Sequence, residues 1–415
     1  MTSYFILLSD ILTQERLSWI DEILKNHFLK GNPEKPDSNS SATTDDVAIY
    51  VTGDALYSFN EIEVWQDWSA ILSLPKVRLI CDKEALDLLG IKYDTLKERF
   101  PDLAASHTCR QSDDCPAFWT TIVSDIFNAS TTTPVQIGWL ETETPYMNRS
   151  VWHGIQCLSA ALDAGYGAGL YAYLDGCHVC HTGQAPDDHE NIGAALEELE
   201  SRAVRNNLPC SIIINRDCAS TRGYTTWNDG LGTVISACTI RPAHIRDLDV
   251  IIRHIKNEPF LLSKNSGGSI FPPDDLTPSK EQIDSNNHTP SVVILVTHSP
   301  YSTGYVFGGI AFAAACSHQG IHTSVVFLED GIFAVSGEHR TNEESDSFTV
   351  PDLLALLSNS KNLDFYALAS SFQRRGLSKN GKLTAVKEID FSGLSRILFY
   401  QPADSLNGNR LFLMF

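Results

Sequence analysis

The chain has 415 residues, 43% of them hydrophobic and 20% charged, which is typical of a globular protein and excludes a fibrous or disordered one. The 51 acidic and 31 basic residues give a net charge of −20 at pH 7, so a phosphate backbone is repelled and direct nucleic-acid binding is disfavoured. No apolar run approaches the ~20 residues of a membrane helix, and the first residues lack the basic region of a signal peptide, so we expect a cytoplasmic protein without membrane contact.

At about 100 to 200 residues per domain, the length predicts several domains. The 10 cysteines are too dilute and too irregularly spaced for a disulfide scaffold. In a reducing compartment they are core thiols, metal ligands or reactive groups.

The first part of the chain, residues 1–130, reads as an α/β domain because short apolar segments alternate with a helical pattern. A short helix after the third strand ends at Gly90. The other expected elements are a strand over residues 4–8, a helix over 12–28, and strands over 47–51 and 77–80.

The same order of elements recurs over residues 134–262. A strand is followed by a helix that ends at Gly165, the next strand ends at the Asp175-Gly176 turn, and a third strand precedes Gly223. The helix is marked by apolar residues at helical spacing: Val151, Ile155, Leu158 and Leu162.

A third copy occupies residues 291–415. Its helix-ending Gly320 and its turn residue Gly331 lie 11 residues apart, as Gly165 and Gly176 do in the second copy. This agreement predicts two repeats of one unit, with the first domain as a more divergent third.

The segment 263–290 is rich in Ser, Gly, Pro and Asp and is therefore interpreted as a linker. Strands that alternate with helices form mostly parallel sheets that helices cover on both faces. The predicted fold class is α/β, with three tandem small three-layer α/β/α domains.

Motifs at matching places carry a resemblance to a known family. The second copy has His181-Thr-Gly183-Gln184 after its Asp-Gly turn, and later Cys218-Ala-Ser-Thr-Arg222-Gly223. These segments resemble the Gly-Gln segment and the Cys-x-x-x-Arg-Gly active-site loop of the DsrE/DsrF-like proteins, whose relatives form sulfur-relay complexes of the Tus and Dsr type. The third copy resembles the DsrF or TusC branch, and the first resembles the DsrH or TusB branch more weakly.

The resemblance identifies Cys218 as the catalytic residue, which would carry sulfane sulfur as a persulfide. The sequence gives a physical reason: Cys218 follows a strand and opens a helical turn, where backbone N–H groups favour a thiolate. Arg216 and Arg222 are expected to lower its pKa, while Asp217 opposes them, and Gly223 completes the loop. The alternative is a buried thiol that acts as a small hydrophobic residue.

Cys177 and Cys180 form a Cys-x-x-Cys-His pattern with His181. Three interpretations stay open: a solvent-exposed turn without chemistry, a secondary thiol pair or metal site, and attachment of haem c, against which the context argues. Cys210, Cys218 and two histidines have no zinc-finger spacing relative to this pair, so no metal site is predicted.

The other two copies depart from the sulfur-carrying pattern. Five residues before the final glycine, where the second copy has Cys218, the third copy has Ser371. The thiol of the first copy, Cys81, is out of register and is interpreted as a core residue. We therefore expect the third copy to be a structural partner.

The predicted function is that of a sulfurtransferase-like relay protein without a cofactor, and whether it acts as an enzyme is left open. A dinucleotide-binding loop G-x-G-x-x-G and a nucleophile elbow G-x-S-x-G are both missing from the expected places. The resemblance implies a persulfide donor protein, an acceptor of the DsrC or TusE type, and a homodimer with six domains in total. The alternative is a non-catalytic scaffold protein on the same fold.

Overall fold

The protein folds into two compact units. Unit 1 comprises Met1–Cys81, Ala85–Gln111 and Ser266–Phe415, and unit 2 comprises Asp82–Glu84 and Ser112–Asn265. The structure, a computed structural model, describes residues 3–30, 46–100, 109–111, 117–129, 136–228, 232–235, 238–257, 260–270, 290–337, 339, 349–377, 385–399 and 409–415.

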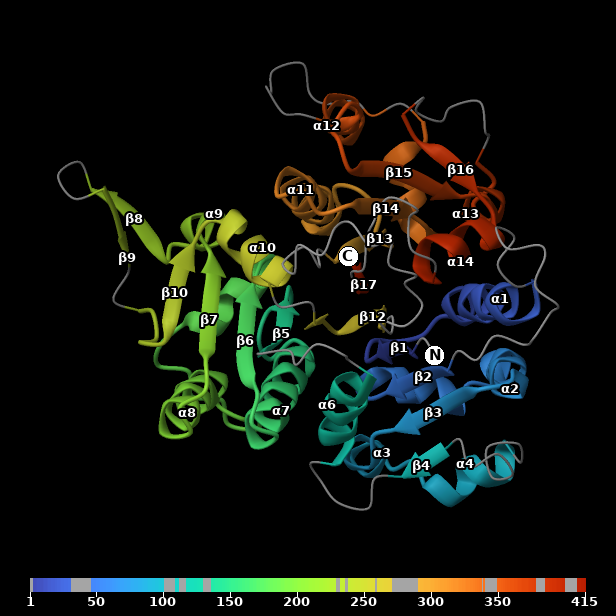
Figure 1. Cartoon of the computed structure of the whole chain (residues 1–415), viewed down its shortest axis with the longest axis horizontal. Coiled ribbons are helices and arrows are strands. Elements are labelled where there is room, and N and C mark those ends of the chain that lie inside the picture. Colours follow the sequence, from blue (N-terminus) through green and yellow to red (C-terminus); the bar gives the residue numbers. More distant parts are fainter. Residues whose placement is uncertain are drawn as a thin grey trace, which may run out of the picture. The chain divides into compact units, whose positions relative to one another are not determined.

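Unit 1 is built on a ten-stranded sheet in the order β16-β15-β14-β13-β17-β12-β1-β2-β3-β4 (Figure 1). The N-terminal strands of this sheet are β1 (Ser3–Leu8), β2 (Asp46–Val51), β3 (Val77–Cys81) and β4 (Cys109–Gln111). The C-terminal strands are β13 (Ser291–Val296), β14 (Thr323–Phe327), β15 (Leu363–Leu368), β16 (Lys387–Ile389) and β17 (Arg410–Met414). Within each set the neighbouring strands pair in parallel.

Strand β12 (Asn265–Ile270) joins the two halves of this sheet, between β17 and β1. It pairs antiparallel with β17. Gly267 allows the close packing, because a Cβ at this position would lie 2.4 Å from the Phe5 carbonyl oxygen and 2.2 Å from the Phe412 ring. The segment 263–290, expected to be a linker, thus begins with a central strand, while residues 271–289 lie outside the described part of the chain.

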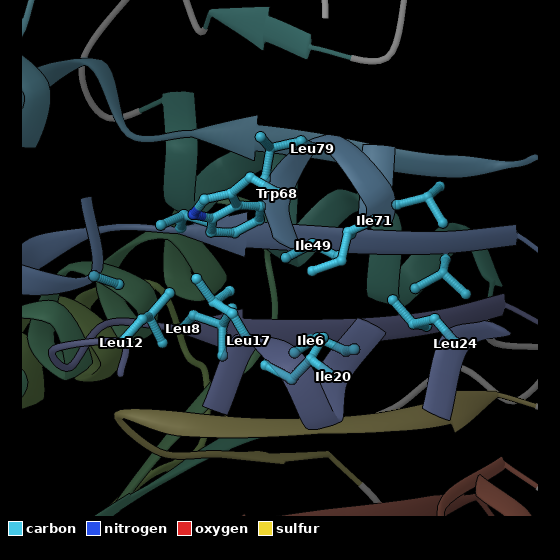
Figure 2. Close-up of a cluster of buried hydrophobic side chains, with 14 of the residues drawn as sticks. Ile6, Leu8, Leu12, Leu17, Ile20, Leu24, Ile49, Trp68, Ile71 and Leu79 are labelled. Carbon is cyan, nitrogen blue, oxygen red and sulfur yellow. The ribbon is translucent and has the colours of Figure 1, made fainter. Parts of the chain in front are cut away.

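Helices of unit 1 bury their apolar sides against this sheet and against one another. In Figure 2, Leu17, Ile20 and Leu24 of α1 face Ile6 and Ile49 of the sheet. The helices are α1 (Gln14–Lys30), α2 (Trp65–Ser73), α3 (Lys83–Leu88), α4 (Tyr93–Arg99), α11 (Tyr305–His318), α12 (Val350–Leu357), α13 (Ala369–Arg374) and α14 (Phe391–Phe399).

The first and third copies share one core. The Ser395 hydroxyl of α14 donates to the Ile23 carbonyl of α1 at 3.0 Å, and the Tyr4 hydroxyl donates to the Phe399 carbonyl at 3.1 Å. The buried apolar cluster runs continuously from residues of β1 to residues of β17. The first and third repeats, although distant in sequence, therefore form one compact unit with a shared core.

Unit 2 has a five-stranded parallel sheet in the order β10-β7-β6-β5-β11. Its strands are β5 (Gln136–Glu141), β6 (Gly167–Ala172), β7 (Cys210–Asn215), β10 (Ala243–Arg246) and β11 (Leu261–Leu262), and a separate hairpin is formed by β8 (Thr225–Asn228) and β9 (Gly232–Ile235). Its helices are α6 (Ala117–Ala129), α7 (Ser150–Asp163), α8 (Ile192–Arg205), α9 (Arg216–Thr221) and α10 (Leu248–Asn257).

Helix α6 belongs to unit 2, although its residues fall within the range 1–130 expected for the first domain. Trp119 of α6 packs edge-on against Trp139 of β5, with ring centroids 5.9 Å apart, and donates through Nε1 to Gln156 of α7 at 3.1 Å. These contacts place α6 on the same core as α7.

The predicted α/β class with parallel sheets is confirmed. The apolar residues expected on one side of α7, from Val151 to Leu162, are all buried. Within the described ranges, no helix combines the length and apolarity required to cross a membrane.

Candidate active site

Cys218 lies in the first turn of α9, directly after β7. Asn215, the last residue of β7, caps this helix, because its Oδ1 accepts a hydrogen bond from the Cys218 N–H at 3.0 Å. Parallel strands bring their carboxyl ends to one edge of a sheet, which is the edge where open α/β sheets bind ligands. Cys218 is partly exposed at this edge.

A backbone amide at the exit of β6 is directed at the sulfur of Cys218. The Leu174 N–H donates to Sγ over 3.3 Å. Leu174 opens the 3₁₀ segment η3 (Leu174–Cys180) with a φ of 51°, a left-handed conformation that is uncommon for residues other than glycine. Gly176 packs so close to β5 that a Cβ there would lie 2.2 Å from the Glu141 carbonyl oxygen, so the turn holds the amide in place.

A second donor to the Cys218 sulfur is the thiol of Cys177, in the same segment η3. This hydrogen bond is the largest of the effects that lower the pKa of Cys218 to about 7; the Leu174 amide and Arg222 act in the same direction, while burial and Asp217 oppose them. The bond to Cys218 and burial raise the pKa of Cys177. Of the two thiols, Cys218 therefore ionises first, while Cys177 stays protonated.

The two arginines predicted beside Cys218 take different positions. Arg222 donates through Nη1 to the Cys218 carbonyl oxygen at 3.0 Å and through Nε to Asp175 at 3.0 Å, which fixes its guanidinium beside the site. Arg216 pairs instead with Asp247, with 2.8 Å between Nη1 and Oδ1. The structure thus brings Arg222, and not Arg216, into contact with the loop of Cys218.

Gly223 ends the loop with a φ of 79°, which a side chain would strain, and it adopts the conformation that is common after the end of a helix. The next residue, Tyr224, is one that the sequence did not single out. Its hydroxyl lies 2.9 Å from Nδ1 of His178, and its ring packs edge-on against His178 and His181. In the sequence, Tyr224 could have been identified from its position directly after Arg222 and Gly223.

Cys177 and Cys180 are both fully buried, so the expectation of a solvent-exposed turn is wrong; the turn packs against the end of the sheet. The Cys180 thiol donates to the Cys177 carbonyl oxygen at 3.0 Å, whereas the Cys177 thiol lies 3.7 and 3.9 Å from the carbonyl oxygens of Ala172 and Asn215. Gln184 secures the segment through hydrogen bonds to the carbonyls of Val179 and His181 at 3.1 and 2.8 Å. No group of three metal-ligating side chains converges among the described residues.

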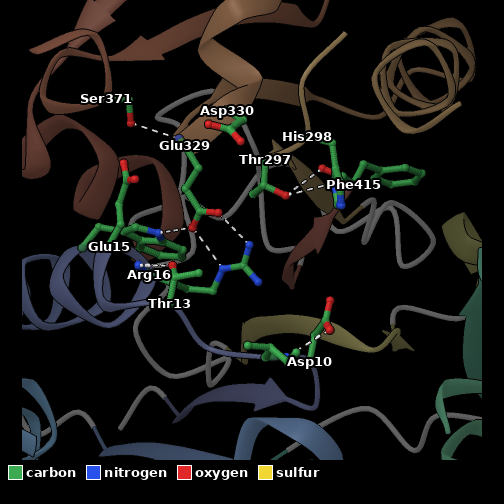
Figure 3. Close-up of polar contacts among 12 residues, drawn as sticks. Asp10, Thr13, Glu15, Arg16, Thr297, His298, Glu329, Asp330, Ser371 and Phe415 are labelled. Atoms are coloured by element: carbon green, nitrogen blue, oxygen red, sulfur yellow. Dashed lines mark hydrogen bonds and ion pairs between the residues drawn. The ribbon is translucent and has the colours of Figure 1, made fainter. Parts of the chain in front are cut away.

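The third repeat has the same geometry around Ser371 (Figure 3). The Glu329 N–H donates to the Ser371 hydroxyl at 3.0 Å, and Glu329 has the same φ of 51° as Leu174. Arg375 donates to Asp330 at 2.8 Å, as Arg222 does to Asp175. Ser371 therefore occupies the position of Cys218 without its thiol.

Helix α1 covers this second site. Arg16 forms a two-armed ion pair with the Glu329 carboxylate, at 3.0 and 2.7 Å (Figure 3). Trp19 donates to the same carboxylate at 2.9 Å. Arg375 also binds Glu15 of α1 at 2.9 and 3.1 Å. In unit 1 this edge of the sheet is used as an internal protein contact.

The first repeat carries a further reduced version of the site. Gly53, with a φ of 54°, takes the place of Leu174 at the exit of β2. Five residues before Gly90 stands Ala85, and Asp82 occupies the position of Asn215 and binds the Glu84 amide at 3.1 Å. The series at the reactive position is thus Cys218, Ser371 and Ala85.

In comparisons with known proteins, one of the three repeats matches a family model. Residues 291–403 match the model of the DsrE/DsrF-like family, so the third repeat is a domain of that family. No curated protein matches the sequence. Among solved structures, the crystal structure of the ychN protein from E. coli is similar, with 18% sequence identity, coverage of 31% of this chain and 100% of that chain, and a TM-score of 0.25.

Proposed function

We propose that this protein carries sulfane sulfur as a persulfide on Cys218 and passes it to a partner carrier protein. The observation that carries the proposal is the partly exposed sulfur of Cys218, which accepts hydrogen bonds from the Leu174 amide and the Cys177 thiol. Donors fixed toward a sulfur favour its thiolate, which is the nucleophilic form. The family match of the third repeat, which shares the turn and loop geometry of Cys218, supports a place in sulfur relay.

Two exchange steps make up the transfer. The Cys218 thiolate attacks the outer sulfur of a donor persulfide, and the donor leaves as a thiolate. A thiolate of the acceptor then attacks the outer sulfur on Cys218, and the Cys218 thiolate leaves, stabilised by the same two donors. Neither step needs an oxidant, a reductant, a metal or a cofactor.

The proposed partners follow from this chemistry. The donor is a protein persulfide, and the acceptor is a small carrier of the DsrC or TusE type with an accessible cysteine. The net charge of −20 favours transfer between proteins, in the cytoplasm, over direct action on nucleic acid. We further propose a homodimer, which would assemble six repeats, and a mass measurement in solution tests it.

The direct test is the intact mass of the protein after incubation with a low-molecular-weight persulfide donor. We expect the wild type to gain about 32 Da, one sulfur atom, and Cys218→Ser to gain none. Equal gains in both proteins, or an unchanged mass of both, would reject Cys218 as the carrier. That outcome would favour the scaffold function, for which the contact of α1 with the Ser371 site is a precedent within this chain.

A further inference from the structure

Cys177 is a buried thiol that the proposed transfer does not use as a sulfur carrier. It is 0% exposed, yet its sulfur reaches the same end of β7 as Cys218. Its Sγ lies 3.9 Å from the carbonyl oxygen of Asn215, the residue whose side chain holds the Cys218 amide. The same sulfur of Cys177 lies 3.7 Å from the Ala172 carbonyl oxygen, and the Leu174 amide, three residues before Cys177 on this turn, binds the Cys218 sulfur at 3.3 Å.

The internal repeats show that this thiol is not required by the fold. Three residues after the positive-φ residue of the turn, where the second repeat has Cys177, the third repeat has Ile332 and the first has Leu56, each fully buried. An apolar side chain fills the same core position in both. The thiol at this position occurs in the one repeat whose reactive position is also a thiol, which a merely space-filling cysteine does not explain.

We propose that Cys177 is a resolving thiol for the Cys218 persulfide, releasing the outer sulfur as hydrogen sulfide when no acceptor is bound. This inference rests on the proposed function. The Cys177 sulfur attacks Sγ of Cys218, the bond between Sγ and the outer sulfur breaks, and a disulfide forms between Cys177 and Cys218. The sulfur of Cys177 is oxidised, the outer sulfur is reduced to sulfide, and the Cys177 proton goes to the leaving sulfide.

Cys180 provides a matched control in the same segment. It is as buried as Cys177, but its thiol donates to the Cys177 carbonyl oxygen at 3.0 Å. Its hydrogen bond is therefore directed away from the reacting sulfur. Substitution of Cys180 removes a buried thiol of η3 without removing the donor to Cys218.

The experiment loads the wild type, Cys177→Ser, Cys177→Ala and Cys180→Ser with a low-molecular-weight persulfide donor, removes the donor, and follows intact mass and free sulfide without an acceptor. In the wild type and in Cys180→Ser, the form with about 32 Da added should convert to one about 2 Da below the reduced protein, with release of one sulfide. Peptide mapping should place the disulfide between Cys177 and Cys218. Both Cys177 variants should retain the added sulfur about ten-fold longer or more.

Two variants at Cys177 separate chemistry from folding, since Ser keeps a polar group at the buried position and Ala removes it. Equal lifetimes of the added sulfur in the wild type and in both Cys177 variants would overturn the inference while leaving the proposed function intact, as would a disulfide to another cysteine. If no protein gains sulfur at all, the proposed function fails, and this inference fails with it.

Discussion

The sulfur of Cys218 lies among groups that favour its thiolate. Cys177 and the Leu174 amide both donate to its sulfur, and Arg222 adds a positive charge from the side. Of these, the Cys177 bond is the largest contribution that lowers the pKa of Cys218 to about 7.

The Cys177→Ala variant should shift the pH dependence of Cys218 alkylation upward. A thiol reacts as its thiolate, so the rate rises with pH through the pKa: the wild type should be half-maximal near pH 7, and the variant closer to the ordinary value of 9.0. The rate of iodoacetamide labelling at Cys218, read by peptide mapping between pH 5 and 10, measures this. Cys180→Ala should keep the wild-type midpoint, and an unchanged midpoint in Cys177→Ala would contradict the assignment.

Glu141 is a second residue of unit 2 whose burial has a measurable consequence. Its carboxyl group, at the end of β5, accepts hydrogen bonds from Trp139, Ser150 and the Glu143 amide at 3.1, 2.9 and 2.8 Å. Burial nevertheless outweighs these bonds and raises its pKa from 4.5 to about 7. The corresponding position in the third repeat is Val296, so the fold itself does not demand a carboxylate.

This raised pKa predicts a loss of stability with rising pH. The folded state prefers the protonated carboxyl, so the contribution of Glu141 is complete below pH 4.5 and is lost as the pH rises through 7, in total about 3 kcal/mol. Denaturant unfolding of the wild type and Glu141→Gln at a series of pH values tests this. The difference in unfolding free energy between the two should change across this window, whereas the exposed Glu197→Gln should give a constant difference.

At the scale of elements, the second and third repeats have the same turn and loop in different surroundings. The segment η5 (Glu329–Val335) and helix α13 reproduce the arrangement of η3 and α9, including the amide that binds the reactive position. Ser371 is only 1% exposed, and helix α1 is fixed over its turn by Arg16 and Trp19. The Cys218 and Ser371 sites therefore differ in what covers them as well as in the side chain.

The Ser371→Cys variant should install a thiol that fails to react. The Glu329 amide would still donate to the new sulfur, but access is closed, so we expect alkylation at least about ten-fold slower than at Cys218. Peptide mapping reads the labelling at position 371 in a Cys218→Ser background, because the chain has other cysteines, and circular dichroism checks that the variant is folded. Labelling as fast as at Cys218 would show that α1 does not protect the site.

At the scale of the whole molecule, β12 is the strand that makes one body from the first and third repeats. It lies between β17 and β1, and the absence of a side chain at Gly267 allows the Phe412 ring and the Phe5 carbonyl to approach. The backbone of Phe5 belongs to a central strand and cannot move aside as a side chain would. A methyl group added at position 267 should therefore destabilise the packing of unit 1.

The Gly267→Ala variant should destabilise unit 1 by about 1 to 3 kcal/mol, the usual range for overpacking a well-packed interior. Hydrogen exchange read by mass spectrometry should show lower protection in peptides of β1, β12 and β17, with peptides of β5, β6 and β7 unchanged. Gly193→Ala, in unit 2, is the control, because its new Cβ comes no closer than 3.2 Å to a neighbouring atom, the side-chain nitrogen of Gln184. Equal loss of protection in both units would contradict the expectation that the effect is confined to unit 1.

The sequence by itself determined the local structure of this protein and the register of its repeats. Helical spacing from Val151 to Leu162 predicted the buried side of α7, since apolar periodicity is read within one turn of the chain. Counting five residues back from each final glycine placed Ser371 opposite Cys218, and the hydrogen bonds of both confirm it. These features depend on residues that are close in sequence, so the amino-acid sequence alone is enough to identify them.

Only the tertiary structure decided which distant segments meet. The Gly- and Ser-rich start of the segment interpreted as a linker forms strand β12. The strands on either side of it in the sheet, β17 and β1, lie more than 140 residues away in the sequence, so the local sequence does not reveal the pairing. The hydrogen bond between Cys177 and Cys218 joins two loops that follow different strands, and the ion pair of Arg16 with Glu329 spans 313 residues. Local composition carries no record of such contacts, because they depend on strand order and packing across the whole sheet.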